Sequence, residues 1–239
     1  MQLVELIALE NGPVSLALLN ARTGVPKTSL THMLRALEDA DYVVRTAAGY
    51  ALGSSSYRMA AAVGRIHDFS AVIGQVLQQV AAQTRETVLL GKATPDRRGG
   101  IYVDRVASPQ PVRFTPDLNE VRPLHCTALG KVLLAWSAPS ELDAYLREEK
   151  LERFTAHTIT RKAALRSELD EVRATGFARS LDEMVEGGGA VAVPVRDGRG
   201  DVAFALVIAA PTHRILPNES AWIALLARQA QVLSSAGIR

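Results

Sequence analysis

The sequence has a single cysteine, Cys126, and aromatic residues make up only 5% of its 239 positions. One cysteine excludes an intrachain disulfide and a cysteine-based zinc site, and we expect no metal and no cofactor. A membrane-spanning helix needs roughly 20 apolar residues in a row, and the longest candidate, Val202–Pro211, is shorter and follows the charged Asp201. The first residues include Glu5 and Glu10 and lack the basic segment of a secretory signal. We therefore expect a cytoplasmic protein without membrane contact.

Charge is nearly balanced, with 27 Lys and Arg against 25 Asp and Glu and a formal net charge of +2. This balance does not by itself indicate a nucleic-acid partner, which has to be inferred from local patterns. Hydrophobic residues make up 48% of the chain, enough to fill a packed core. The run Ser54-Ser55-Ser56 marks a boundary, which predicts a small domain over residues 1–53, a linker helix over 54–69 and a larger domain over 70–239.

The segment after Pro26 predicts an amphipathic helix. Its apolar side chains recur at i, i+3, i+4 and i+7, and polar side chains with the same spacing lie on the opposite face. A short helix capped by Ser15 and a turn at Gly24 precede it, which is the helix-turn-helix plan whose second helix enters the DNA major groove. An ordinary surface helix has the same pattern, so this helix alone leaves both interpretations open. The apolar positions are Leu30, Met33, Leu34 and Leu37, and the polar ones are Thr28, Thr31, His32 and Arg35.

Two short strands, over residues 42–45 and 50–52, predict a hairpin after this helix, which is the position of a wing. Arg45 then has two interpretations. It contacts DNA, at a backbone phosphate or in the narrow groove, or it lies at a solvent-exposed end of the strand. Residues 1–53 carry four basic and five acidic side chains, which is unlike a basic DNA clamp. We therefore expect few phosphate contacts per subunit and a need for dimerisation.

The remainder of the chain alternates helix and strand patterns. They predict an α+β domain in which helices pack on a mixed sheet. The expected strands are 88–92, 101–106, 190–195 and 202–209, and the expected helices are 57–69, 70–84, 127–136, 140–149, 161–175 and 220–235.

The segment Pro123–Thr127 is a candidate pocket for a small anion, because Thr127 can cap a helix whose first N–H groups point outward. The alternative is an ordinary capped helix. A hydrolase using Cys126 is a further alternative. It is disfavoured because the adjacent His125 points the other way on an extended chain and no nucleophile signature surrounds the cysteine.

Four stretches share their order and spacing with one known family. They are Thr23–Thr28 with Leu34–Glu38, Gly49–Gly53, Arg122–Lys131, and Gly176–Ala178 with Val191–Val195. On these stretches the chain resembles the isocitrate-lyase-regulator (IclR) type of bacterial transcription factor over almost its whole length. The resemblance implies a winged helix-turn-helix domain, a linker helix and a GAF-like effector domain. It also implies a homodimer, often a dimer of dimers, on palindromic double-stranded operators, with a small organic acid as the controlling effector.

The resemblance also implies site residues. The DNA-reading positions fall on Lys27, Thr28, Ser29, Thr31, His32 and Arg35, with Arg45 on the wing. The effector positions fall on Thr127, Ala128, Leu129, Gly130, Ser180, Asp182, Gly188, Ala190, Val207 and Ala209. Ser180-Leu181 and Ala190 replace polar residues that many members have, which favours a larger or aromatic carboxylate. The alternative function is a small-molecule sensor or enzyme-like module whose helix-turn-helix serves protein contacts.

Overall fold

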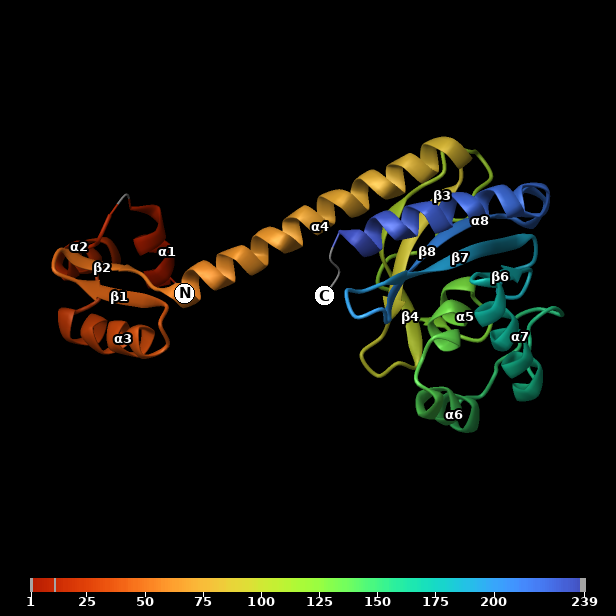
Figure 1. The fold of residues 1–239 in the computed structure, drawn as a ribbon, viewed down its shortest axis with the longest axis horizontal. Helices are drawn as coiled ribbons and strands as arrows, with labels where there is room; N and C mark the ends of the chain where they lie inside the picture. The colour runs from red at the N-terminus through yellow and green to blue at the C-terminus, as the bar shows by residue number, and fades with distance from the viewer. Residues whose placement is uncertain (1, 11, 237–239) are drawn as a thin grey trace. The chain divides into compact units, whose positions relative to one another are not determined.

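The structure is a computed structural model that describes residues 2–10 and 12–236, apart from the side chains of residues 2 and 61–69. The chain, drawn in Figure 1, divides into two compact units, Met1–Asp68 and Phe69–Arg239. This division lies next to the predicted end of the linker helix. Among the described residues, no helix combines the length and the apolar character that crossing a membrane requires.

The first unit contains three helices and a hairpin around a small core. Leu30 and Leu34 of the third helix are fully buried against Leu19 and Val43. Val14 forms a β-bridge with Tyr50, which ties the hairpin to the segment before the second helix. The elements are α1 (Gln2–Leu9), α2 (Leu16–Thr23), α3 (Lys27–Asp39), β1 (Val43–Thr46) and β2 (Gly49–Leu52).

Local sequence explains where these elements begin and end. The Ser15 hydroxyl accepts a hydrogen bond from the Leu18 N–H at 3.2 Å and caps α2. Gly24 ends α2 in the left-handed conformation, with φ at 69°, which glycine adopts without steric cost. Pro26 occupies the N-cap of α3 and not its first helical position. The predicted helix-turn-helix and hairpin are confirmed.

Two predictions in this region need correction. Met33 is half exposed, because its position lies at the edge of the buried stripe and the small core does not extend that far. The two helices expected over residues 57–84 form one helix, α4 (Ser54–Thr84), because no proline interrupts them and isolated glycines such as Gly64 and Gly74 are tolerated within a helix.

The second unit is built on a six-stranded sheet in the order β5-β4-β3-β8-β7-β6. Every strand pair among its described residues is antiparallel, so the sheet is not mixed as predicted, although the α+β class is confirmed. Its strands are β3 (Thr87–Ala93), β4 (Gly99–Val106), β5 (Arg122–Pro123), β6 (Ala178–Leu181), β7 (Gly188–Arg196) and β8 (Val202–Pro211).

Helices cover both faces of this sheet (Figure 1). On β8, Leu206 and Ile208 face the layer formed by α8 and the end of α4, whereas Val207 faces α5. Because side chains alternate along a strand, a nearly continuous apolar run is what a sheet covered on both sides requires. The helices are α5 (Ala128–Ala135), α6 (Pro139–Glu148), α7 (Lys162–Thr175) and α8 (Thr212–Ser235).

Helix α8 begins at Thr212, before the predicted start at residue 220, and contains Pro217. Tertiary contacts hold its first turns despite the proline. Ile215 is fully buried, and the Arg214 guanidinium donates to both carboxylate oxygens of Glu86, at 2.6 and 3.0 Å. A bidentate pair of this kind is strong and directional.

Candidate nucleic-acid interface and ligand cavity

Helix α3 presents a polar face that the first unit leaves uncovered. Burial of Leu30 and Leu34 turns the opposite side of the helix outward. All seven residues predicted to read DNA are exposed: Lys27, Thr28, Ser29, Thr31, His32, Arg35 and Arg45. The side of the helix that would enter a groove is therefore open.

The cations of this face have no partners among the described residues, whereas other arginines nearby are paired. Arg22 lies 3.1 Å from Glu10, and Arg58 donates to the Ser54 and Ser55 hydroxyls. No hydrogen bond or ion pair among the described residues engages the side chains of Lys27, Arg35 or Arg45. These three cations come from α3 and the wing, and they give this face local positive charge in a unit with little net charge.

Arg45 lies on β1 directly opposite Tyr50 on β2. Tyr50 is buried and Arg45 is exposed, and only Ala47 and Ala48 connect the two strands. Gly49 is required in this hairpin because a side chain there would clash with the backbone of Val14. The wing is thus short and anchored, and it presents one cation.

The second unit contains a cavity of about 250 Å³ at the N-terminus of α5, which we name the Thr127 cavity. Strand β4, the segment before β5, the start of α5 and the β6–β7 connection surround it. Six of the ten predicted effector residues line it: Thr127, Ala128, Ser180, Gly188, Ala190 and Ala209.

The other four predicted residues, Leu129, Gly130, Asp182 and Val207, lie outside this lining. Leu129 and Val207 are fully buried in the core between α5 and the sheet. Gly130 allows the backbone of Leu124, and not a ligand, to approach α5, since a Cβ there would clash with it. The Asp182 carboxylate accepts from the Gly187 N–H at 2.7 Å and the Thr212 hydroxyl at 2.8 Å, so it holds a turn.

Two further lining residues lie within predicted segments: Cys126 belongs to the candidate anion pocket Pro123–Thr127, and Gly189 lies between the predicted Gly188 and Ala190. Sequence reasoning missed seven lining residues. Several of them belong to the irregular segment between β4 and β5, which has no periodic pattern that would place its side chains. The missed residues are Tyr102, Phe114, Thr115, Pro116, Arg122, Met184 and Val185.

The polar groups of this cavity fall into two sets. The Thr127 hydroxyl donates to the Pro123 carbonyl at 2.8 Å and accepts from the Gly130 N–H at 3.0 Å, and the Ser180 hydroxyl donates to the Cys126 carbonyl at 2.8 Å. In contrast, Thr115 Oγ1 and Arg122 Nε are buried and have no hydrogen-bond partner among the described residues. Among the described residues that line the cavity, Thr115 and Arg122 are therefore the ones with a buried polar atom that has no partner.

Cys126 is not suited to nucleophilic chemistry. Burial, followed by the nearby Glu183 carboxylate, raises the pKa of its thiol to about 12. Its sulfur lies 3.7 Å from the Met184 sulfur. Burial also lowers the pKa of His125, whose Nε2 lies 2.9 Å from the Glu152 carbonyl and, in the neutral tautomer that donates, hydrogen-bonds to it. The thiol is thus protonated at neutral pH, and the hydrolase alternative has no support.

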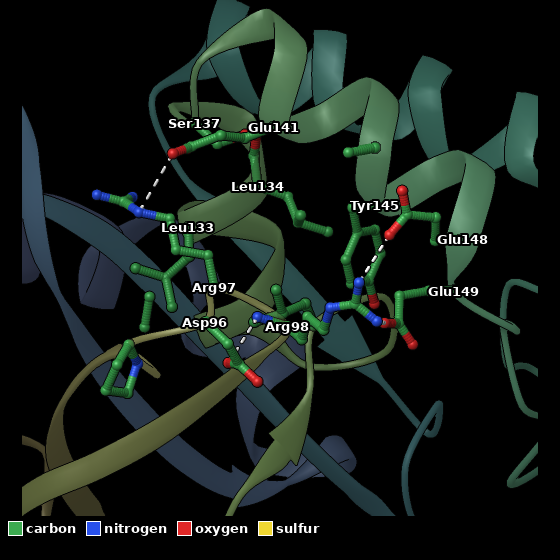
Figure 2. Close-up of a pocket in the computed structure, with 14 residues that line it drawn as sticks. Asp96, Arg97, Arg98, Leu133, Leu134, Ser137, Glu141, Tyr145, Glu148 and Glu149 are labelled. Carbon is green, nitrogen blue, oxygen red and sulfur yellow. Dashed lines mark hydrogen bonds and ion pairs between the residues drawn. The ribbon is translucent and has the colours of Figure 1, made fainter.

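A second cavity, of about 350 Å³, lies near the opposite end of α5 and is named here the Tyr145 cavity (Figure 2). Leu133 and Leu134 contribute apolar surface to it. Arg98 reaches across its mouth to Glu148 at 2.7 Å, as Figure 2 shows. Its charged groups pair with one another, whereas Thr115 Oγ1 and Arg122 Nε of the Thr127 cavity have no partner among the described residues.

Comparison with known proteins places this arrangement in a family. The family models of the IclR helix-turn-helix domain and of the bacterial transcriptional regulator IclR C-terminal domain match residues 1–47 and 61–235. The probable transcriptional regulator SauR from Cupriavidus necator is 32% identical over 220 residues, 91% of this chain and 86% of that protein. The IclR transcriptional regulator from Alicyclobacillus acidocaldarius is 29% identical with a TM-score of 0.67, covering 94% of this chain and 90% of that one.

A third similar protein is the inducer-binding domain of the Acinetobacter PobR transcription factor, solved as a double mutant with 3-hydroxybenzoic acid. It is 29% identical with a TM-score of 0.61, covering 67% of this chain and 94% of that one. The relatives are named as transcriptional regulators, so the chain is a regulator and not an enzyme. With a helix-turn-helix unit for DNA and a separate effector-binding unit, the chain belongs to the IclR family of bacterial transcriptional regulators.

Proposed function

We propose that this regulator binds a palindromic operator as a homodimer or a dimer of dimers, with α3 in the major groove and Arg45 on the adjacent backbone or minor groove. The observation that carries this proposal is that Lys27, Arg35 and Arg45 are exposed and have no side-chain partner within the described part of the chain. Three such cations per subunit make few phosphate contacts, so two half-sites bound together supply the affinity. In this role the protein acts on chromosomal DNA in the cytoplasm.

The effector in this proposal is a small organic acid bound in the Thr127 cavity. The volume of about 250 Å³ suits a small ligand, and Tyr102, Phe114 and Met184 give the cavity an apolar and aromatic lining. The PobR inducer-binding domain holds 3-hydroxybenzoic acid, which supports an aromatic acid here as well. The proposed site residues are the six predicted ones that line the cavity, together with Arg122.

Control by the ligand requires that it bind more tightly to one state of the regulator than to another. Helix α4 runs from the first unit into the second and is the covalent route between them. Ligand binding would therefore change the spacing of the two recognition helices in a dimer, and α4 would transmit that change. The coupling cannot exceed the difference in the ligand's affinity for the two states.

A pull-down of genomic DNA fragments with the full chain tests the proposal, repeated with a panel of carboxylic acids. We expect enrichment of a fragment that contains an inverted repeat, and a change in that enrichment with one class of acid. A salt titration on the enriched fragment should show the steep loss of affinity that phosphate contacts cause. Absence of any enriched fragment, or binding that does not respond to salt, would favour the alternative in which the helix-turn-helix serves protein contacts.

A further inference from the structure

Three buried side-chain polar atoms have no hydrogen-bond partner among the described residues, and two of them belong to residues that line the Thr127 cavity. These are Thr115 Oγ1 and Arg122 Nε. From this we infer that Arg122 and Thr115 hold the anionic head group of the effector. The inference rests on the proposed function, because it assumes that this cavity is the effector site, and it names the ligand class.

Native proteins rarely leave a buried donor without an acceptor, because the group loses its water and gains nothing in return. Two such groups on residues that line one cavity are most simply explained by an acceptor that the ligand supplies. An oxyanion fits, because it can accept from the Arg122 Nε–H and the Thr115 hydroxyl together.

The ion pair of Arg122 does not involve its Nε. The outer edge of its guanidinium donates to the Glu120 carboxylate, with 2.6 Å between NH2 and Oε2, and that carboxylate is more than half exposed. Among the described residues that line the cavity, Arg122 is the only one with a charged side chain. The cavity therefore offers one positive charge, and the Glu120 pair at its solvent side is screened by water.

The other lining residues determine the rest of the ligand. The hydroxyls of Thr127 and Ser180 already donate to backbone carbonyls, and Cys126 carries a neutral thiol. Ala190 and Ala209 add only methyl groups. A second anionic group placed there would be desolvated without a cation, which is unfavourable. The ligand class is thus a monoanion with one carboxylate, or a similar oxyanion head such as a sulfonate, on a single apolar ring or a branched alkyl body.

This assignment gives the anion to the side chains of Arg122 and Thr115, and not to the helix N-terminus that the sequence indicated. The Thr127 hydroxyl is occupied as a cap, whereas Arg122 and Thr115 have unused donors. A short oxo acid would reach the head-group donors but would leave the apolar lining unfilled. A dicarboxylate would fill the cavity but would place its second charge against that lining.

Calorimetric titration of the full chain tests the inference with benzoate, benzenesulfonate, benzamide, phthalate and glyoxylate as probes. We expect benzoate or benzenesulfonate to bind, and comparison of the two identifies the preferred head group. Benzamide, which has the same shape without the charge, should bind at least about tenfold more weakly, as should phthalate and glyoxylate. That factor corresponds to the loss of one hydrogen bond to a charged group.

Variants distinguish loss of the head-group contact from loss of the folded structure. Arg122→Gln should weaken binding of the preferred anion by about tenfold or more while leaving binding of benzamide unchanged. Thr115→Val, which keeps the shape of the side chain, should weaken the anion severalfold. Arg113→Gln is the matched control, because Arg113 is an exposed arginine of the same segment that donates to the Gln110 carbonyl and does not line the cavity. The melting temperature of each variant shows that it is folded.

Equal binding of benzoate and benzamide, wild-type affinity in Arg122→Gln, or no binding of any of the five probes overturns the inference. These results differ from failure of the proposed function, which is absence of operator binding by the wild-type chain. A folded Arg122→Gln variant that still binds the operator but no longer responds to the preferred anion supports both.

Discussion

The ammonium group of Lys131 lies 2.5 Å from Oε1 of Glu183, and the lysine is completely buried. The same nitrogen lies 2.6 Å from Glu168 on α7 and 3.1 Å from the Arg179 carbonyl on β6. Glu183 precedes Met184, which lines the Thr127 cavity. One buried cation thus joins α5, α7, β6 and the β6–β7 connection beside the Thr127 cavity.

Replacing this cation should be costly to stability. Lys131→Met leaves Glu183 buried without its partner, and we expect a loss of about 3–5 kcal/mol in the free energy of unfolding of the second unit. The double variant Lys131→Met with Glu183→Gln should lose clearly less than Lys131→Met alone. Both tryptophans of the chain, Trp136 and Trp222, lie in the second unit, so their fluorescence in a urea titration follows this unit.

Lys150→Met is the control for this experiment, because Lys150 is exposed. It should change the free energy of unfolding by less than about 0.5 kcal/mol. A Lys131→Met variant as stable as the control would show that the buried pair adds nothing to the stability of this unit.

His125 should make the second unit sensitive to acid. Burial lowers the pKa of His125 below the ordinary value of 6.5. Between these two pKa values the unfolded chain binds a proton that the folded chain does not, so the free energy of unfolding falls as the pH drops below about 6.5. His125→Gln, whose amide can still donate to the Glu152 carbonyl, should lose less stability between pH 7.5 and pH 5.

Glu183, whose pKa burial raises, acts in the opposite direction but is present in both proteins, so it cancels from the difference. Urea titrations at several pH values between 5 and 7.5 measure the effect. Parallel stability profiles for wild type and His125→Gln would contradict the assignment of acid sensitivity to this imidazole.

Cys126 should react slowly with alkylating reagents. A thiol pKa of about 12 leaves on the order of a thousandfold less thiolate at pH 8 than an ordinary cysteine with a pKa near 8.5. Mass spectrometry after timed exposure to iodoacetamide measures this rate in the folded chain. Labelling in urea is the control, since unfolding removes the burial and should restore the rate of a free thiol. A rate in the folded chain equal to that in urea would show that the thiol is open to solvent.

Arginines of the first unit should differ in their effect on operator binding. Arg35→Ala and Arg45→Ala remove unpartnered cations, so each should weaken binding and lower the log–log salt slope by about 0.9 for every phosphate that is no longer neutralised. Arg22→Ala removes an arginine that is paired with Glu10 and should have a smaller effect. Gel-shift titrations on the enriched fragment at several salt concentrations provide the comparison. If all three variants showed the same operator affinity and the same salt slope, α3 and the wing would have no special role in DNA binding.

Parts of the fold could be predicted because their signals are local. The spacing of Leu30 and Leu34 predicted the buried face of α3, and Gly24 predicted the turn before it. The prediction was wrong for Met33, because periodicity gives the direction of a side chain but not the extent of the core. It also placed the start of α8 too late, because the contacts of Ile215 and Arg214 that stabilise its first turns come from distant parts of the chain.

By itself, the sequence determined the α+β class, the helix-turn-helix and the identity of the residues on its outer face, because helical and strand periodicity depend only on neighbouring residues. Only the tertiary structure decided which side chains line the Thr127 cavity, that Lys131 is buried between two glutamates, and that Arg122 retains an unused donor. The physical reason is that a cavity and its unpaired atoms arise where segments far apart in the chain converge, and no single segment carries that information.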